Sequence, residues 1–178
     1  MNNRRLAFYI AAVALQAIII ASVPLPTIQA LWHGRTVILK VEPYDPYDIM
    51  GGYYAQLGYD ISRKNAFSTT TLDIKRDTRI YAVIKEGATQ DAPWKPVSLG
   101  KSPPVNLPPN QVFLCGTYNG RRVSYGIEKF YFSEEQRDSI EQDLSTTPIL
   151  ALAEVKVDPS GRSALVRLRV GNRIYQTK

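Results

Sequence analysis

The 178-residue sequence is poor in the residues from which catalytic and metal sites are most often built. Cys115 is the only cysteine, so the chain cannot form an internal disulfide. It lies in the apolar segment 112–115, where we expect a buried small side chain and not a reactive thiol. His33 is the only histidine, which excludes a site with several histidine ligands, and no Cys/His spacing suits zinc. We therefore expect neither a metal nor a cofactor.

Runs of basic residues and glycine-rich phosphate loops are also missing. The formal net charge is +6, but no run of Lys and Arg exceeds two residues. This scatter is typical of a solvated charged surface, and we expect no nucleic-acid partner. Gly51 and Gly52 belong to a tyrosine-rich stretch and not to a phosphate loop. A Ser-His-Asp triad would need His33, whose neighbours in the sequence offer no support for one.

One long apolar run is present, at residues 6–23, and only Gln16 interrupts it. A helix of about 18 residues is near the lower limit for crossing a hydrocarbon core of about 30 Å. Arg4 and Arg5 precede the run, which favours a cytoplasmic N-terminus and an outward-facing remainder. A cleaved signal peptide is the alternative. We favour a retained anchor, because the run is longer than a usual signal and residues 21–23 and 28–30 are poor cleavage sites.

These observations divide the chain into two parts. Residues 1–32 form the cytoplasmic start, the transmembrane anchor and a juxtamembrane linker, and residues 33–178 form one outward-facing domain. The expected location is the inner (cytoplasmic) membrane, crossed once, with the C-terminal domain extracytoplasmic. About 150 residues suffice for one hydrophobic core.

Short β-branched segments separated by turn residues predict the fold of this domain. Asn119-Gly120 predicts a two-residue hairpin turn with positive φ at both positions. Ser133 and Gln136 predict a capping box that starts one short helix. The expected fold is mainly β with one short helix, an antiparallel sandwich or partial barrel preceded by one N-terminal transmembrane helix. In strand 162–170, we expect Ala164, Val166, Leu168 and Val170 to face inward. The expected strands are 36–41, 53–61, 79–85, 112–118, 121–127, 149–157, 162–170 and 173–175.

The most distinctive stretch joins a Pro/Asp loop to a tyrosine-rich strand. The loop holds Pro43, Asp45, Pro46 and Asp48, and the strand alternates so that Tyr53, Ala55, Leu57, Tyr59 and Ile61 share one face. With Gly52 and Tyr54, this stretch resembles the signature of the GDYXXLXY protein family, Gly-Asp-Tyr-x-x-Leu-x-Tyr, although Tyr53 stands at the Asp position. A later segment similar to that family is Tyr125-Gly126-Ile127-Glu128. The resemblance implies a membrane-anchored protein without an established activity, associated with other membrane proteins.

Two functions remain open. The first is a non-enzymatic binding or assembly module for another membrane protein, which would present an exposed tyrosine-lined patch. The alternative is an envelope hydrolase using acidic residues near the motif, which would hold Asp45 or Asp48 together with Glu128 in a concave pocket. The residues that we single out for the motif and for binding are Asp45, Asp48, Gly52, Tyr54, Leu57, Tyr59 and Glu128.

Overall fold

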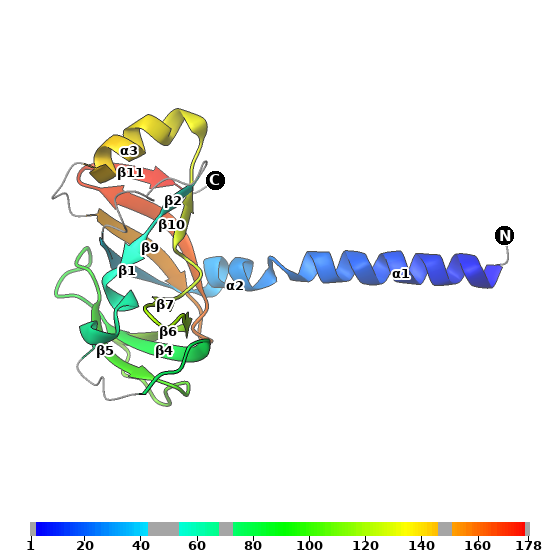
Figure 1. Cartoon of the computed structure of the whole chain (residues 1–178), viewed down its shortest axis with the longest axis horizontal. Helices are drawn as coiled ribbons and strands as arrows, with labels where there is room; N and C mark the ends of the chain where they lie inside the picture. The colour runs from blue at the N-terminus through cyan, green and yellow to red at the C-terminus, as the bar shows by residue number, and fades with distance from the viewer. Residues whose placement is uncertain (1–2, 43–53, 68–72, 146–150, 177–178) are drawn as a thin grey trace.

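The strands predicted from alternating residues assemble into two main antiparallel sheets (Figure 1). The computed structural model describes residues 3–42, 54–67, 73–145 and 151–176, and in these the fold is mainly β with three α-helices. One sheet has the order β11-β10-β9-β1-β3 and the other β5-β4-β6-β7, while β2 pairs with β8. Within the described residues, these sheets do not close into a barrel. The bounds are β1 Arg35–Glu42, β2 Tyr54–Gln56, β3 Gly58–Tyr59, β4 Thr78–Lys85, β5 Lys95–Gly100, β6 Gln111–Tyr118, β7 Val123–Ser124, β8 Lys129–Tyr131, β9 Ala151–Val157, β10 Ser163–Val170 and β11 Arg173–Gln176.

The apolar N-terminal run forms a helix that projects away from the β domain (Figure 1). Helix α1 spans Asn3–Ser22, and α2 follows at Leu25–His33. The break falls at Pro24, because a proline disfavours helical geometry in the residue before it. In the described part of the chain, no single helix is long and apolar enough to cross a membrane, but the bent pair Ala7–Ser22 and Thr27–His33, at 45°, suffices by length and composition. The single N-terminal helix expected from the sequence is therefore replaced by the two helices α1 and α2.

Helix α2 is attached to the β domain without a linker. It packs against β9 and β10, with Ala30 fully buried. The Gly34 N–H donates to the Ala30 carbonyl at 2.9 Å, and β1 begins at the next residue. A Cβ added to Gly34 would lie 2.2 Å from that carbonyl and 2.9 Å from the Val157 nitrogen. The helix and strand thus meet more closely there than any larger residue would permit.

One hydrophobic core lies between the sheets and extends beneath the β2–β8 pair. Alternate residues of β1 are buried, whereas Val83 in β4 and Leu152 in β9 are buried in addition to the alternating residues beside them. Helix α3, Arg137–Ser145, follows a short 3-10 turn at Glu134–Gln136, and the predicted capping box between Ser133 and Gln136 is present. The main contributors to the core are Val37, Leu39, Ile80, Ala82, Ile84, Leu114, Phe130, Ile140, Ala153, Val155 and Leu168.

The predicted two-residue turn at Asn119-Gly120 is wrong. Tyr118 pairs with Val123, so the loop has four residues, and of the two positions only Gly120 has positive φ, at 96°. The Asn119 side-chain oxygen accepts the N–H groups of Arg121 and Arg122 at 3.0 and 2.8 Å. This side chain closes the wider loop, which a dipeptide rule does not anticipate. The strand expected at 121–127 is correspondingly reduced to β7.

Strand β10 also departs from the predicted alternation. Its register with β9 shifts between Leu165 and Arg167, which places Val166 at a bulge. Ala164, Leu168 and Val170 are buried as expected, but Val166 is only half-buried. An extra residue in one strand interrupts the alternation of faces at that point.

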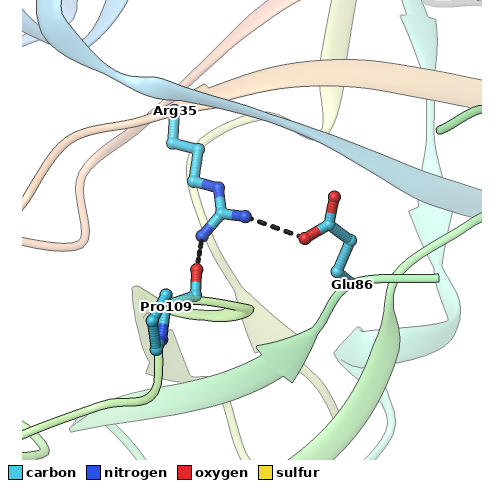
Figure 2. A network of polar contacts seen from close by, with 3 residues as sticks. All are labelled: Arg35, Glu86 and Pro109. Atoms are coloured by element: carbon cyan, nitrogen blue, oxygen red, sulfur yellow. Dashed lines mark hydrogen bonds and ion pairs between the residues drawn. The ribbon is translucent and has the colours of Figure 1, made fainter.

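The two main sheets are joined at their adjacent ends by polar contacts to loops (Figure 2). Arg35, at the start of β1, donates to the Pro109 carbonyl and pairs with Glu86 at 2.9 Å. Its guanidinium lies 4.9 Å from the centre of the Trp94 ring, and the backbone N–H of Trp94 donates to the Ile38 carbonyl at 2.8 Å. An exposed pair alone contributes little, so the stacked ring and the backbone bond matter more here.

A second joint uses a glycine. The Gly161 carbonyl, in the turn between β9 and β10, accepts the Cys115 N–H of β6 at 2.7 Å. Gly161 has φ of 82°, and an added Cβ would lie 2.5 Å from the Phe113 ring. The turn thus sits directly against the neighbouring sheet, where only glycine fits.

We predict that Gly161→Ala destabilises the domain more than Gly126→Ala does. Both glycines have φ of 82°, but an added Cβ at Gly126 meets nothing within 4 Å. The left-handed backbone alone costs about 1–2 kcal/mol. The Phe113 clash should add about 1–3 kcal/mol. Urea unfolding of both variants measures the difference, and equal losses would show that Phe113 moves aside freely.

Candidate functional site

The tyrosine-rich strand changes its partner in the middle of the motif. Strand β2 pairs with β8, whereas β3, only one residue later, pairs with β1. Between them, the Leu57 N–H donates to the Glu128 carbonyl at 2.7 Å. The predicted alternation nevertheless holds, because Ala55, Leu57, Tyr59 and Ile61 are all buried, with at most 1% of each exposed. Leu57 is therefore the point where the strand turns from one sheet to another.

The motif segment 57–61 and the later segment 125–128 are tied together by two reciprocal hydrogen bonds. The Tyr59 hydroxyl donates to the Ile127 carbonyl at 2.7 Å, and the Tyr125 hydroxyl donates to the Ile61 carbonyl at 2.7 Å. Both bonds are buried. Each tyrosine thus satisfies a main-chain acceptor in the segment that carries the other. We call this pair of bonds, with the Leu57 bond to Glu128, the tyrosine clasp.

The Glu128 carboxylate accepts hydrogen bonds from the backbone of its own loop. One carboxylate oxygen accepts the Tyr125 N–H at 2.5 Å, and the other accepts the Gly126 N–H at 2.9 Å. Gly126 has positive φ, which brings the two N–H groups toward one carboxylate. The sequence Tyr-Gly-Ile-Glu therefore encodes a closed turn: the glycine supplies the geometry and the glutamate binds the exposed amides.

Burial and nearby acids disfavour ionisation of the clasp tyrosines. Desolvation raises the pKa of Tyr59 well above its usual value near 10, and the Glu128 charge raises it further. The pKa of Tyr125 is raised in the same way, by desolvation first and then by Glu128 and Asp60. Desolvation also raises the pKa of Asp60, although its bond from the Ile61 N–H opposes this. Both hydroxyls therefore stay protonated as donors throughout the physiological range.

The outward side of the β2–β8 pair presents aromatic and charged groups. Tyr54 lies opposite Tyr131, with ring centroids 5.8 Å apart, and the Lys129 ammonium lies 4.7 Å from the centre of the Tyr54 ring. Tyr131 is 50% exposed and Tyr54 is half-buried. We call Tyr54, Lys129 and Tyr131 the aromatic patch. Tyrosine is enriched in contact surfaces between proteins.

A groove of about 350 Å³ runs beside the aromatic patch. Its walls come from the motif segment, the 119–122 loop, β7 and the Glu128 turn. They present polar and apolar surface in nearly equal parts, with Lys129 and Arg122 as basic groups and Glu128 as the acid. In the described residues, no group of three or more His, Cys, Asp or Glu side chains is placed to hold a metal ion.

The family model for GDYXXLXY protein matches residues 16–168. The chain belongs to the GDYXXLXY family. The match extends from within α1 to within β10, so it includes α2, α3 and the four-stranded sheet, whereas β11 of the five-stranded sheet lies outside it. No curated protein and no solved structure matches the chain.

The structure places four of the residues singled out from sequence. Leu57 and Tyr59 are core residues of the GDYXXLXY motif, Glu128 binds backbone amides, and Tyr54 alone contributes to an outward surface. Asp45, Asp48 and Gly52 lie outside the described residues. The sequence pointed to Tyr125 only as part of the family-like segment 125–128, and it did not predict Lys129 and Tyr131 as binding residues. Alternation around the buried Phe130 was the signal for Lys129 and Tyr131, since both flank it.

We predict that Tyr59→Phe and Tyr125→Phe each destabilise the domain by about 1–2 kcal/mol. Each change leaves a buried carbonyl without its donor while preserving the ring. Tyr54→Phe is the control, because its hydroxyl has no hydrogen-bond partner in the part of the chain that the structure describes, and it should change stability by less than about 0.5 kcal/mol. Chemical denaturation measures all three. A loss no larger than that of Tyr54→Phe would contradict the clasp.

The same tyrosines predict loss of stability in alkali. Above about pH 10 the unfolded chain loses these protons while the folded chain keeps them, so the unfolded state gains stability as pH rises. Each tyrosine should lower the unfolding free energy by up to about 1.4 kcal/mol per pH unit there. Denaturation between about pH 8 and 11 should show a shallower decline in the double Phe variant. An unchanged slope would show that the two residues titrate alike in both states.

Proposed function

We propose that this protein is a membrane-anchored extracytoplasmic binding or assembly module for another membrane protein. The aromatic patch and its adjoining groove carry this proposal. Tyr131 is half-exposed, is paired with Tyr54 and lies on a strand whose opposite side is locked in the core through Phe130. An aromatic pair on a rigid strand loses little conformational entropy when a partner covers it.

The helical N-terminus supports the membrane part of the proposal. Phe8, Ile10 and Val13 of α1 are each more than 60% exposed, and the helix projects away from the β domain (Figure 1). Such a surface is stable when lipid surrounds it. Together with Arg4 and Arg5 before the run, this favours a single anchor in the inner membrane with the β domain outside.

The hydrolase alternative gains no support from Glu128. A general acid or base needs a carboxyl group free to exchange a proton with substrate. Both oxygens of Glu128 instead accept backbone N–H groups at 2.5 and 2.9 Å. The acid in the groove therefore stabilises a turn, which favours contact over turnover as the role of this surface.

Photo-crosslinking in intact membranes tests the proposal. A photoreactive phenylalanine at Tyr131 should capture one membrane protein, whereas the same probe at Val105, which is 82% exposed in the loop after β5, should not. Lys129→Glu should reduce capture at residue 131 several-fold, because it removes the cation over Tyr54 and reverses the local charge.

Two outcomes would overturn the binding-module reading. The first is equal capture from residues 131 and 105, which would indicate random collisions. The second comes from a complementation assay with protein levels measured. If Asp45→Asn abolished function while the protein stayed folded and abundant, and Lys129→Glu did not, the hydrolase reading would replace it.

A further inference from the structure

A second cavity, of about 440 Å³, lies where the anchor helices join the β domain. It reaches Thr27 in the first turn of α2, and its other walls come from β4, β6, β7 and the residues that begin β10. The apolar run 6–23 ends just before the break at Pro24, so a bilayer that holds this run alone would have its surface near Pro24, and Thr27 would lie about one helical turn, or about 5 Å, beyond it. On that placement the cavity would be at the depth of lipid headgroups.

The polar groups of this cavity form an ordered row. Arg79 on β4 lies opposite Thr117 on β6, and Thr117 lies opposite Ser124 on β7. Such cross-strand neighbours have Cβ atoms about 5 Å apart and point to one side of the sheet. All three are exposed. The sheet therefore presents a guanidinium and two hydroxyls along a single line.

A second guanidinium comes from another part of the fold. Arg162 follows the Gly161 turn, which the Cys115 N–H binds at 2.7 Å, so its backbone is fixed against β6. Within the described residues, neither Arg79 nor Arg162 has an ion-pair partner, and the cavity lining contains no Asp or Glu. The groove beside the aromatic patch differs, because Glu128 lies in its wall.

We propose that this cavity binds the phosphate of an anionic phospholipid headgroup. Two guanidiniums with hydroxyls, and no Asp or Glu in the lining, match the monoanion of a phosphodiester, since arginine donates paired hydrogen bonds to phosphate oxygens. Its position at the root of the anchor selects lipid as the source over a soluble phosphate. The inference rests on α1 being a membrane anchor, and it adds a lipid ligand, which orients the domain against the bilayer, to the proposed partner contact.

The test uses the full chain purified in non-ionic detergent and titrated with phosphatidylglycerol, phosphatidylcholine or inorganic phosphate. The thermal unfolding midpoint reports binding, because a ligand of the folded state raises it. Native mass spectrometry counts the lipids retained. The wild-type chain should be stabilised by phosphatidylglycerol and not by equal concentrations of the other two. Arg79→Gln/Arg162→Gln should weaken the apparent affinity for phosphatidylglycerol about tenfold or more.

The matched control is Lys85→Gln/Lys95→Gln. These two exposed lysines are cross-strand neighbours on β4 and β5, outside the cavity lining, and their loss removes the same charge. The control should bind phosphatidylglycerol like the wild type. Three results would each overturn the proposal: wild-type affinity in the arginine variant, an equal loss in the lysine control, or full stabilisation by inorganic phosphate alone.

Extraction of cell membranes with alkali judges the anchor separately. Release of the chain would overturn the membrane-anchored function. The detergent titration does not depend on insertion into a bilayer, so its result tests only whether the cavity binds the lipid.

Discussion

The two buried tyrosine hydroxyls of the clasp tie segment 57–61 to segment 125–128, just beyond the end of the β2–β8 ladder. Strand β2 belongs to one small sheet and β3 to the five-stranded sheet, so the backbone at Leu57 must leave one ladder for another. Main-chain groups at such a departure are costly when buried without partners. Tyr59, Tyr125 and the Glu128 carbonyl supply those partners at 2.7 Å each. The core, the β2–β8 pair and the groove beside it all take their positions from this arrangement.

The clasp also gives a physical meaning to the two separated sequence segments that mark the family. Residues 57–61 supply a leucine and a tyrosine to the core, and residues 125–128 supply the complementary tyrosine, the left-handed glycine and the glutamate. Neither segment is satisfied without the other. Among the described residues, what remains for outside contact is the reverse side of the same strands, with Tyr54, Lys129 and Tyr131. The motif is thus an architectural device whose outward face is available for binding.

Local patterns predicted much of this fold, because local forces decide the elements concerned. Period-2 alternation places Ala55, Leu57, Tyr59 and Ile61 correctly, and the capping box at Ser133 requires only four consecutive residues. The clasp was not predictable in this way, since its donors and acceptors are 64 and 68 residues apart. The predictions for Val166 and for the loop at Asn119 were wrong for a related reason. The register between β9 and β10 produces the bulge at Val166, and the Asn119 side-chain oxygen closes the loop. Neither can be read from residue type alone.

The single-residue joint at Gly34 determines how the domain can move. A chain anchored through a long polar tether samples many orientations, whereas here α2 is packed on β9 and β10 and passes into β1 through one crowded glycine. Rotation at this joint would break the bond to Ala30. The β domain and α2 therefore form one rigid unit, and a change of angle relative to α1 occurs at the break at Pro24. If α1 is the proposed membrane anchor, the aromatic patch would change its angle to the membrane only together with α2.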